Sequence, residues 1–556
     1  MRADLLLGDE AVAYGAIDAG IGGAFSYPGT PSTEILELIQ KYVSARGGWR
    51  QAGLFAEWSA NEKVAYEEAL GMSYAGCRAL VSMKHVGLNV AMDPFVSSAL
   101  TGVNGGIVVV VADDPSMHSS QNEQDSRYLA EFAKIPCFEP STQQQAYELT
   151  RHAFEYSERI GLPVMIRLVT RLCHSRANVI MEGEDGQLRA AALERGTLPR
   201  QDPNDWVLVP VNARRRYRHL LDLQPRLVKD TEISPYNKLR LAGRRGIITS
   251  GIAHNYVREV LGPSIEEVSL LRIDHYPIPP GTVRRLVDHC DEIFVIEEGY
   301  PFIEQRLNGV LGVPGKAIRG KLTGDLPDAG ELNPNLVGAA LGRPIEHTTL
   351  PVPDLAARPP QLCKGCPHAD SFKAIIEATD SYQEPILFSD IGCYALGVMP
   401  PFRAVQSCVD MGSSIAMAHG ASRTGTHPII CTIGDSTFAH SGMTPLIGAA
   451  FHDADITVFV LDNATVAMTG TQDSLACGER LVEILGGLGV DPEHMHVLDP
   501  RPQKHDENVE VIRNELEHRG LSVIIPRRAC IHVKAARPQQ VTIQQCGSCT
   551  REPLNN

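Results

Sequence analysis

An acid and an amide follow two apolar segments in the second half of the chain. Gly434-Asp435-Ser436 comes directly after the apolar run at residues 427–433, and Asn463 follows a second run at residues 456–462. If both runs are buried parallel strands, these side chains lie at neighbouring strand ends. A hard divalent cation takes about six oxygen ligands, of which a diphosphate supplies only some. The spacing therefore predicts a diphosphate and metal site, although an ordinary strand-turn-helix followed by an Asp-Asn turn has the same pattern.

A carboxylate in the first part of the chain suits one diphosphate cofactor. Glu62 lies in a predicted helix on which Ala65, Ala69 and Met72 mark one face. A glutamate that hydrogen-bonds the aminopyrimidine ring of thiamine favours the tautomer that deprotonates the thiazolium carbon. Most acids on a helix are simply solvated, so Glu62 is assigned this role only because the diphosphate motif accompanies it. Together the two motifs predict thiamine diphosphate and Mg²⁺ as cofactors.

Four of the 13 cysteines fall into a pattern that suits metal or redox chemistry. Cys363 and Cys366 form a Cys-x-x-Cys pair, Cys393 follows an Ile-Gly pair, and Cys530 comes soon after an apolar run. No secretory signal opens the sequence, so we expect a cytoplasmic, reducing environment in which disulfides do not form. Four thiolates scattered along a fold suit a [4Fe–4S] cluster.

Zinc is the alternative ligand for the Cys-x-x-Cys pair. Structural zinc sites prefer two close pairs of ligands, and Cys546-Gly-Ser-Cys549 supplies a second pair near the end of the sequence. A zinc site made of Cys363, Cys366, Cys546 and Cys549 therefore stays open at this point. Cys546 and Cys549 also fit free thiols in a tail.

Five segments together resemble one protein family. The segments are residues 27–33, 61–65, 112–127, 363–368 and 434–442. They are similar to the large (alpha) subunits of indolepyruvate:ferredoxin oxidoreductases, within the 2-oxoacid:ferredoxin oxidoreductase family, and the resemblance spans roughly residues 1–535. It implies oxidative decarboxylation of an aryl 2-oxoacid to an acyl-CoA and carbon dioxide. Coenzyme A is then a co-substrate, and a [4Fe–4S] cluster takes the electrons one at a time.

The resemblance also implies roles for individual residues. Glu62 and Thr30 match catalytic positions, and Thr30 matches a threonine that touches the substrate carbonyl or carboxylate, although its hydroxyl would also suit a helix N-cap. The resemblance places Mg²⁺ on the Asp435 and Asn463 side chains and the Thr465 carbonyl. The full cofactor-binding set is Gly434, Asp435, Ser436, Asn463, Thr465 and His368. The implied cluster ligands are Cys363, Cys366, Cys393 and Cys530.

Partners follow from the same resemblance. It implies a separate small (beta) subunit, a heterotetramer of two large and two small subunits, and ferredoxin or another electron carrier. Large subunits of this family normally continue into a ferredoxin-like domain with two cysteine-rich cluster motifs, whereas this sequence ends at Asn556 with only one Cys-x-x-Cys pair beyond Cys530. Two other functions therefore stay open, namely a non-oxidative thiamine-dependent decarboxylase or carboligase and a non-catalytic partner subunit.

The elements that position these residues are expected to form a multidomain α/β protein of the thiamine-diphosphate-binding type. Alternating apolar and amphipathic segments predict doubly wound parallel sheets in two domains, with a smaller α/β domain between them. The expected parts are a pyrimidine-binding domain (1–175), a polar connector (176–240), a transketolase-C-like domain (241–345), a Pro-rich linker (346–360), a diphosphate-binding domain (361–535) and a tail (536–556).

Composition excludes several other classes of protein. The 556 residues carry a formal net charge of −15 without a long single-sign block, so nucleic acid is not an expected partner. No apolar run approaches the roughly 20 residues needed to cross a bilayer, so no membrane contact is expected either.

Overall fold

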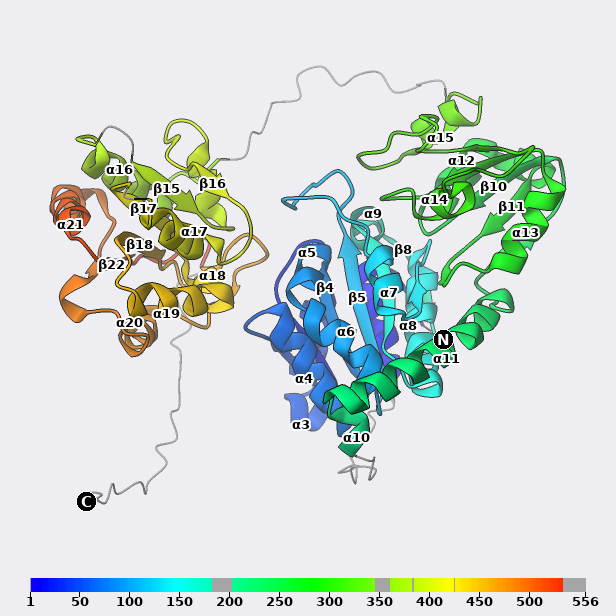
Figure 1. Cartoon of the computed structure of the whole chain (residues 1–556), viewed down its shortest axis with the longest axis horizontal. Helices are drawn as coiled ribbons and strands as arrows, with labels where there is room; N and C mark the ends of the chain where they lie inside the picture. The colour runs from blue at the N-terminus through cyan, green and yellow to red at the C-terminus, as the bar shows by residue number, and fades with distance from the viewer. Residues whose placement is uncertain (1, 183–202, 346–360, 383–384, 425, 534–556) are drawn as a thin grey trace. The chain divides into compact units, whose positions relative to one another are not determined.

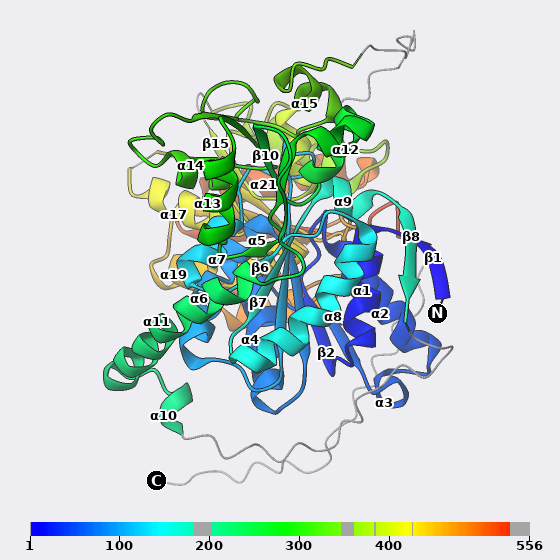
Figure 2. The ribbon, with the colours of Figure 1, turned by 90° about the vertical axis from the view of Figure 1, so that its right-hand side faces the viewer.

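The computed structural model describes residues 2–182, 203–345, 361–382, 385–424 and 426–533. The chain divides into two compact units, Met1–Ala357 and Arg358–Asn556, each described here by itself (Figure 1 and Figure 2). Among the helices of the described residues, none has the length and apolar composition needed to cross a membrane.

A seven-stranded sheet forms the core of the first unit. Its strand order is β12-β6-β7-β5-β4-β2-β3, and only the edge strand β12 runs antiparallel. All seven residues of β5 are buried, as expected for a parallel sheet covered by helices on both faces. The strands are β2 (Gly23–Ser26), β3 (Phe55–Trp58), β4 (Ala79–Lys84), β5 (Ile107–Asp113), β6 (Cys137–Phe138), β7 (Val164–Val169) and β12 (His275–Tyr276).

Helices follow these strands along the chain and cover the sheet. They include α1 (Gly8–Asp18), α2 (Thr33–Ala45), α4 (Glu62–Tyr74), α5 (His85–Val90), α6 (Met92–Thr101), α7 (Arg127–Ala133), α8 (Gln143–Ile160) and α9 (Thr170–His174). A separate two-stranded sheet pairs β1 (Arg2–Leu6) antiparallel with β8 (Ala177–Met181).

The expected polar connector contains regular structure. Besides β8, its described part holds α11 (Pro210–Glu232), a helix of 23 residues with Pro225 inside it. Only four of its side chains are buried, namely Asn212, Leu220, Leu227 and Thr231. α11 packs against the unit through these few side chains and forms no hydrophobic core of its own. Its largely polar sequence therefore predicts a connector.

A second, five-stranded sheet lies later in the first unit, in the order β14-β13-β10-β11-β9. Its strands are β9 (Lys238–Arg240), β10 (Arg245–Thr249), β11 (Ser269–Arg272), β13 (Glu292–Ile296) and β14 (Ala317–Arg319), and its helices are α12 (Ala253–Leu261), α13 (Pro280–His289), α14 (Phe302–Asn308) and α15 (Pro334–Ala340). This segment also supplies β12, in which His275 pairs with Phe138 of β6. The two sheets of the first unit are therefore joined by strand pairing.

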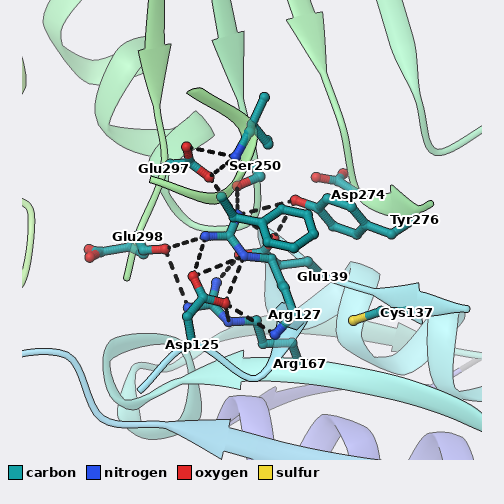
Figure 3. A network of polar contacts seen from close by, with 12 residues as sticks. Asp125, Arg127, Cys137, Glu139, Arg167, Ser250, Asp274, Tyr276, Glu297 and Glu298 are labelled. Carbon is teal, nitrogen blue, oxygen red and sulfur yellow. Dashed lines mark hydrogen bonds and ion pairs between the residues drawn. The ribbon is translucent and has the colours of Figure 1, made fainter. Parts of the chain in front are cut away.

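A buried network of charges makes a second connection between these two sheets (Figure 3). Arg127 and Arg167 are both fully buried. Arg127 pairs with Asp125 at 2.5 Å and with Glu297, the residue that follows β13 of the second sheet, at 2.9 Å. Arg167 pairs with Asp113 at 2.6 Å and with Glu139. Because buried charges need partners, each arginine compensates carboxylates that would otherwise be strongly unfavourable.

Replacing Arg127 with methionine should therefore lower the free energy of unfolding by about 3–5 kcal/mol, because Asp125 and Glu297 would stay buried without their cation. Denaturant unfolding followed by circular dichroism measures this loss. Arg151→Met is the matched control, since its pair with Glu182 is largely exposed and such pairs contribute about 0–1 kcal/mol. Equal losses in the two variants would show that the network does not stabilise the fold.

The second unit is built on a six-stranded parallel sheet in the order β16-β15-β17-β18-β22-β21. Its strands are β15 (Ile386–Ser389), β16 (Ser407–Cys408), β17 (Ile429–Gly434), β18 (Ile456–Leu461), β21 (Met495–Leu498) and β22 (Leu521–Pro526). The long helices are α16 (Pro367–Thr379), α17 (Ser413–Ser422), α19 (Met443–Phe451), α20 (Gly478–Gly487) and α21 (His505–Glu517). Every residue of β17 and β18 is buried, so these two strands fix the positions of the residues that follow them.

Candidate functional site

Asp435 and Asn463 lie at one edge of the second unit's sheet. β17 and β18 are neighbouring parallel strands, with Gly434 opposite Leu461 at their carboxyl ends. Asp435 is the first residue after β17 and is 1% exposed, while Asn463 follows β18 by two positions and is 6% exposed. The Ala464 amide lies beside the Asp435 carboxylate. The fold therefore brings the acid and the amide of the sequence motif to the same place.

The Asp435 carboxylate is incompletely satisfied. One oxygen, Oδ1, accepts a hydrogen bond from the Ser436 amide at 2.8 Å, whereas Oδ2 has no hydrogen-bond partner among the described residues. Burial, together with the negative charge of Asp462, raises the pKa of Asp435 to about 8. A divalent cation supplies the counter-charge and the bond that the free oxygen lacks. The residues present thus fit a metal ion at this position.

Asn463 is held by contacts on both ends of its carboxamide. Its Oδ1 accepts the Thr465 amide at 3.2 Å, and its Nδ2 lies 3.2 Å from Nε2 of His368. Burial and the nearby Arg528 charge lower the pKa of His368 to about 4, so this imidazole is neutral near pH 7. His368 and Thr465, both assigned from the sequence, therefore meet at Asn463.

Two residues at this edge were missed by the sequence reasoning. Tyr394 packs so closely on Gly434 that a Cβ there would lie 2.7 Å from the tyrosine ring. Asp390 follows β15 and accepts the Gly412 amide at 2.7 Å and the Ser414 amide at 3.0 Å, which anchors the start of α17. An acid directly after an apolar strand was the available signal for Asp390, whereas the Tyr394 contact depends on packing that the sequence does not reveal.

The four patterned cysteines also come together in the second unit. Cys366 directly precedes α16, and Cys393 begins a short 3₁₀ helix over Cys393–Val398. Burial and the neighbouring thiols of Cys366, Cys530 and Cys363 raise the pKa of Cys393 to about 11. The Cys530 amide donates to the Asn463 carbonyl at 3.1 Å. The Cys393 thiol is therefore near enough to the other three to feel their charge, and Cys530 lies next to the loop that carries Asn463.

The four thiols do not form a tight group of metal ligands in the described part of the chain. Zn–S bonds of about 2.3 Å place tetrahedral ligands roughly 4 Å apart. No three of the four Sγ atoms, all in the described part of the chain, lie within 4.8 Å of one another. Cys546 and Cys549, the other members of the alternative zinc site, lie outside the described residues.

Glu62 lies in the first unit, where it is the first residue of α4 and is 4% exposed. The preceding Asn61 caps the helix by accepting the Val64 amide at 2.9 Å. A Cβ at Gly87 would lie 2.5 Å from Oε1 of Glu62, so glycine at this point of α5 leaves the space that the carboxylate occupies. The sequence reasoning did not identify Gly87, because the two positions are 25 residues apart.

Thr30 lies before α2 and outside the helix. α2 begins at Thr33 and Ser32 occupies the N-cap position, so Thr30 does not cap the helix. The Thr30 carbonyl accepts the Ser119 hydroxyl at 3.1 Å, and Nζ of Lys84 donates to the Ser119 carbonyl at 3.0 Å. Lys84 is a further member of this group that the sequence reasoning missed, although a lysine ending a buried strand was its signal.

Comparison with known proteins gives the family. The family model described as "Pyruvate flavodoxin/ferredoxin oxidoreductase, thiamine diP-bdg" matches residues 14–214, and "Thiamine pyrophosphate enzyme, C-terminal TPP binding domain" matches residues 390–524. Indolepyruvate oxidoreductase subunit IorA of Methanothermobacter thermautotrophicus is 39% identical over 98% of this chain and 90% of its own length. The chain belongs to the IorA family.

Other members of the family give the same result. The IorA subunit of Archaeoglobus fulgidus is 39% identical over 94% of this chain and 86% of its own length, and that of Pyrococcus horikoshii is 35% identical over 95% and 85%. These matches confirm the predicted family, the α/β thiamine-binding fold and a thiamine-diphosphate-dependent 2-oxoacid:ferredoxin oxidoreductase. Because the relatives are named as subunits, a partner subunit is implied as well. The individual site residues stay predictions.

Proposed function

We propose that the chain is the large subunit of an enzyme that converts an aryl 2-oxoacid such as indolepyruvate, with coenzyme A, to the acyl-CoA and carbon dioxide. The substrate class rests on the printed name of the relatives, indolepyruvate oxidoreductase subunit IorA. The observation that supports cofactor chemistry most strongly is the free, buried Oδ2 of Asp435 at the end of β17. We propose that the chain forms a heterotetramer with a small (beta) subunit in the cytoplasm. Ferredoxin or another electron carrier is the proposed electron acceptor.

The residues of the second unit are suited to hold thiamine diphosphate and Mg²⁺. Asp435 and Asn463 offer oxygen ligands for the metal, and the Thr465 carbonyl is the third proposed ligand. Gly434 and Ser436 flank the acid, and neutral His368 touches Asn463. When bound, thiamine diphosphate supplies an electron sink for decarboxylation.

The residues of the first unit are suited to proton transfer and substrate binding. Glu62 is buried in a space that Gly87 leaves open, so its carboxyl group is held in place for exchange of a proton with a ring nitrogen. Thr30 is fixed through the Ser119 contact, which leaves its hydroxyl as the group proposed to bind the substrate carboxylate or carbonyl.

We propose that Cys363, Cys366, Cys393 and Cys530 hold one [4Fe–4S] cluster, which accepts electrons singly. The electrostatic effect of these thiols on one another supports this ligand set. The hydrogen bond from the Cys530 amide to the Asn463 carbonyl, which links Cys530 to the proposed metal loop, supports a cluster near that loop.

Iron analysis of anaerobically purified protein tests the cluster. We expect about four iron and four sulfide per chain with a broad absorption near the blue end of the visible spectrum, and loss of most of this iron in Cys393→Ser. Cys77→Ser is the control, because Cys77 belongs to the other unit and should leave the iron content unchanged. A colourless, iron-free protein would instead favour a non-oxidative thiamine decarboxylase or carboligase.

A further inference from the structure

Three ligand side chains converge in the first unit, away from the residues assigned above. They come from the start of α1, the first turn of α2 and the end of α9, and are Asp9, Glu34 and His174. One carboxylate oxygen of each acid and one imidazole nitrogen lie within 4.8 Å of one another. Nε2 of His174 is 3.6 Å from Oε2 of Glu34.

Asp9 distinguishes this group from an ordinary cluster of surface acids. Its side chain is 0% exposed, and neither carboxylate oxygen has a hydrogen-bond partner among the described residues. The Cys173 thiol lies beside it without forming a hydrogen bond of good geometry. The next residue, Glu10, is satisfied by the Leu7 amide at 2.8 Å. A buried carboxylate that lacks a partner is unfavourable unless another charge or a metal compensates it.

The backbone holds Asp9 in this position. A Cβ at Gly8 would lie 2.2 Å from the Leu172 carbonyl, so the start of α1 rests directly on the backbone of α9. That contact turns the Asp9 carboxylate toward the segment that carries His174. His174 itself reaches solvent, with a side chain 35% exposed, so an ion has a route into the group.

We propose that Asp9, Glu34 and His174 bind one divalent metal ion of the zinc type. Carboxylate oxygen and imidazole nitrogen are both common zinc ligands, and three protein ligands leave a further position for water. In the metal-bound form, two ionised carboxylates and a neutral imidazole would carry a charge of −2, which one divalent ion balances. The ion would tie the starts of α1 and α2 to α9, and its role would be structural.

Zinc binding to the full-length protein tests the site. The purified protein is first freed of metal with a chelator and then saturated with Mg²⁺ and thiamine diphosphate. Titration with zinc in competition with a chromophoric chelator gives the affinity, and metal analysis gives the number of zinc ions retained per chain. We expect wild type to hold one zinc more per chain than Asp9→Asn or Glu34→Gln. Loss of a direct ligand should weaken that site by about 100-fold or more, since even outer-sphere changes cost 10–100-fold.

Two controls separate the site from other causes. Glu37→Gln lies one turn further along α2 with a side chain 31% exposed, and it should keep the full zinc content. Thermal unfolding shows whether the variants fold. Zinc should raise the melting temperature of wild type but not that of Asp9→Asn. Without metal, Asp9→Asn should melt at the same temperature as wild type or higher. If Asp9→Asn fails to fold, Glu34→Gln still tests the site, because the Glu34 side chain is partly exposed.

Equal zinc content in wild type, Asp9→Asn and Glu34→Gln would overturn the proposal. So would zinc that disappears only in the double variant Cys546→Ser/Cys549→Ser, because it would then belong to the cysteine pair near the end of the chain. Wild type that binds no zinc would overturn the proposal as well.

Discussion

Replacing Glu62 with glutamine should lower 2-oxoacid turnover by about two to four orders of magnitude, the range typical of a general acid–base group, while thiamine diphosphate stays bound. The carboxamide has nearly the same shape as the carboxylate and fits the space beside Gly87. It cannot exchange a proton as the carboxyl group does. Binding and turnover should therefore separate in this variant.

Cofactor binding by fluorescence quenching, together with anaerobic turnover in the presence of the small subunit, measures both quantities. Glu67→Gln is the control, because Glu67 lies on the same helix with a side chain 45% exposed and pairs with Lys63. Full turnover by Glu62→Gln would remove Glu62 from the catalytic machinery. Loss of cofactor binding in that variant would assign Glu62 to binding instead.

Asp435→Asn should weaken Mg²⁺-dependent binding of thiamine diphosphate by about 100-fold or more, a change of roughly 2.7 kcal/mol in binding free energy. The metal loses its anionic ligand, while the asparagine keeps the shape of the buried side chain. The cofactor-free variant should unfold at the same temperature as wild type or higher, because the substitution removes a buried acid whose pKa is raised to about 8.

Calorimetry with and without Mg²⁺ measures the affinity for thiamine diphosphate. Thermal unfolding measures how much the cofactor stabilises the protein, and this stabilisation should be lost in Asp435→Asn but not in the control. The matched control is Asp473→Asn, since Asp473 is an exposed residue of the nearby strand β20 (Gln472–Asp473). Retained cofactor affinity in Asp435→Asn would contradict a metal site at the end of β17.

The sequence predicted the site best where a local pattern of residues directly determines the position of a side chain in the fold. β17 and β18 are continuous apolar runs because the sheet is buried on both faces, and their carboxyl ends position Asp435 and Asn463 directly. The cysteine pattern predicted that Cys393 and Cys530, which are 137 positions apart (530 − 393), belong to one group. The Cys530 thiol is among the groups that raise the pKa of Cys393, and the cluster itself stays a prediction.

Other features depend on packing between distant segments and have no local signal. Gly87 matters only because α5 passes beside Glu62, and the Gly434–Tyr394 contact arises only in the folded sheet. The sequence did not predict helix α11, because the segment is largely polar and contains Pro225. Its buried apolar side chains are only those of Leu220 and Leu227. In the sequence, Asp9 looks like an ordinary acid at the start of a helix. Only the structure shows that it is buried and that its carboxyl oxygens have no hydrogen-bond partner among the described residues.

Anaerobic mixing of the complete enzyme with indolepyruvate tests the central claim most directly. The large and small subunits together with thiamine diphosphate and Mg²⁺ should release carbon dioxide and bleach the iron–sulfur absorption. The acyl-CoA should form only when coenzyme A and an electron acceptor such as ferredoxin are added, because the oxidation releases two electrons and a [4Fe–4S] cluster accepts them singly. Carbon dioxide release that yields an aldehyde, with no bleaching and no acyl-CoA, would contradict oxidative decarboxylation by this chain.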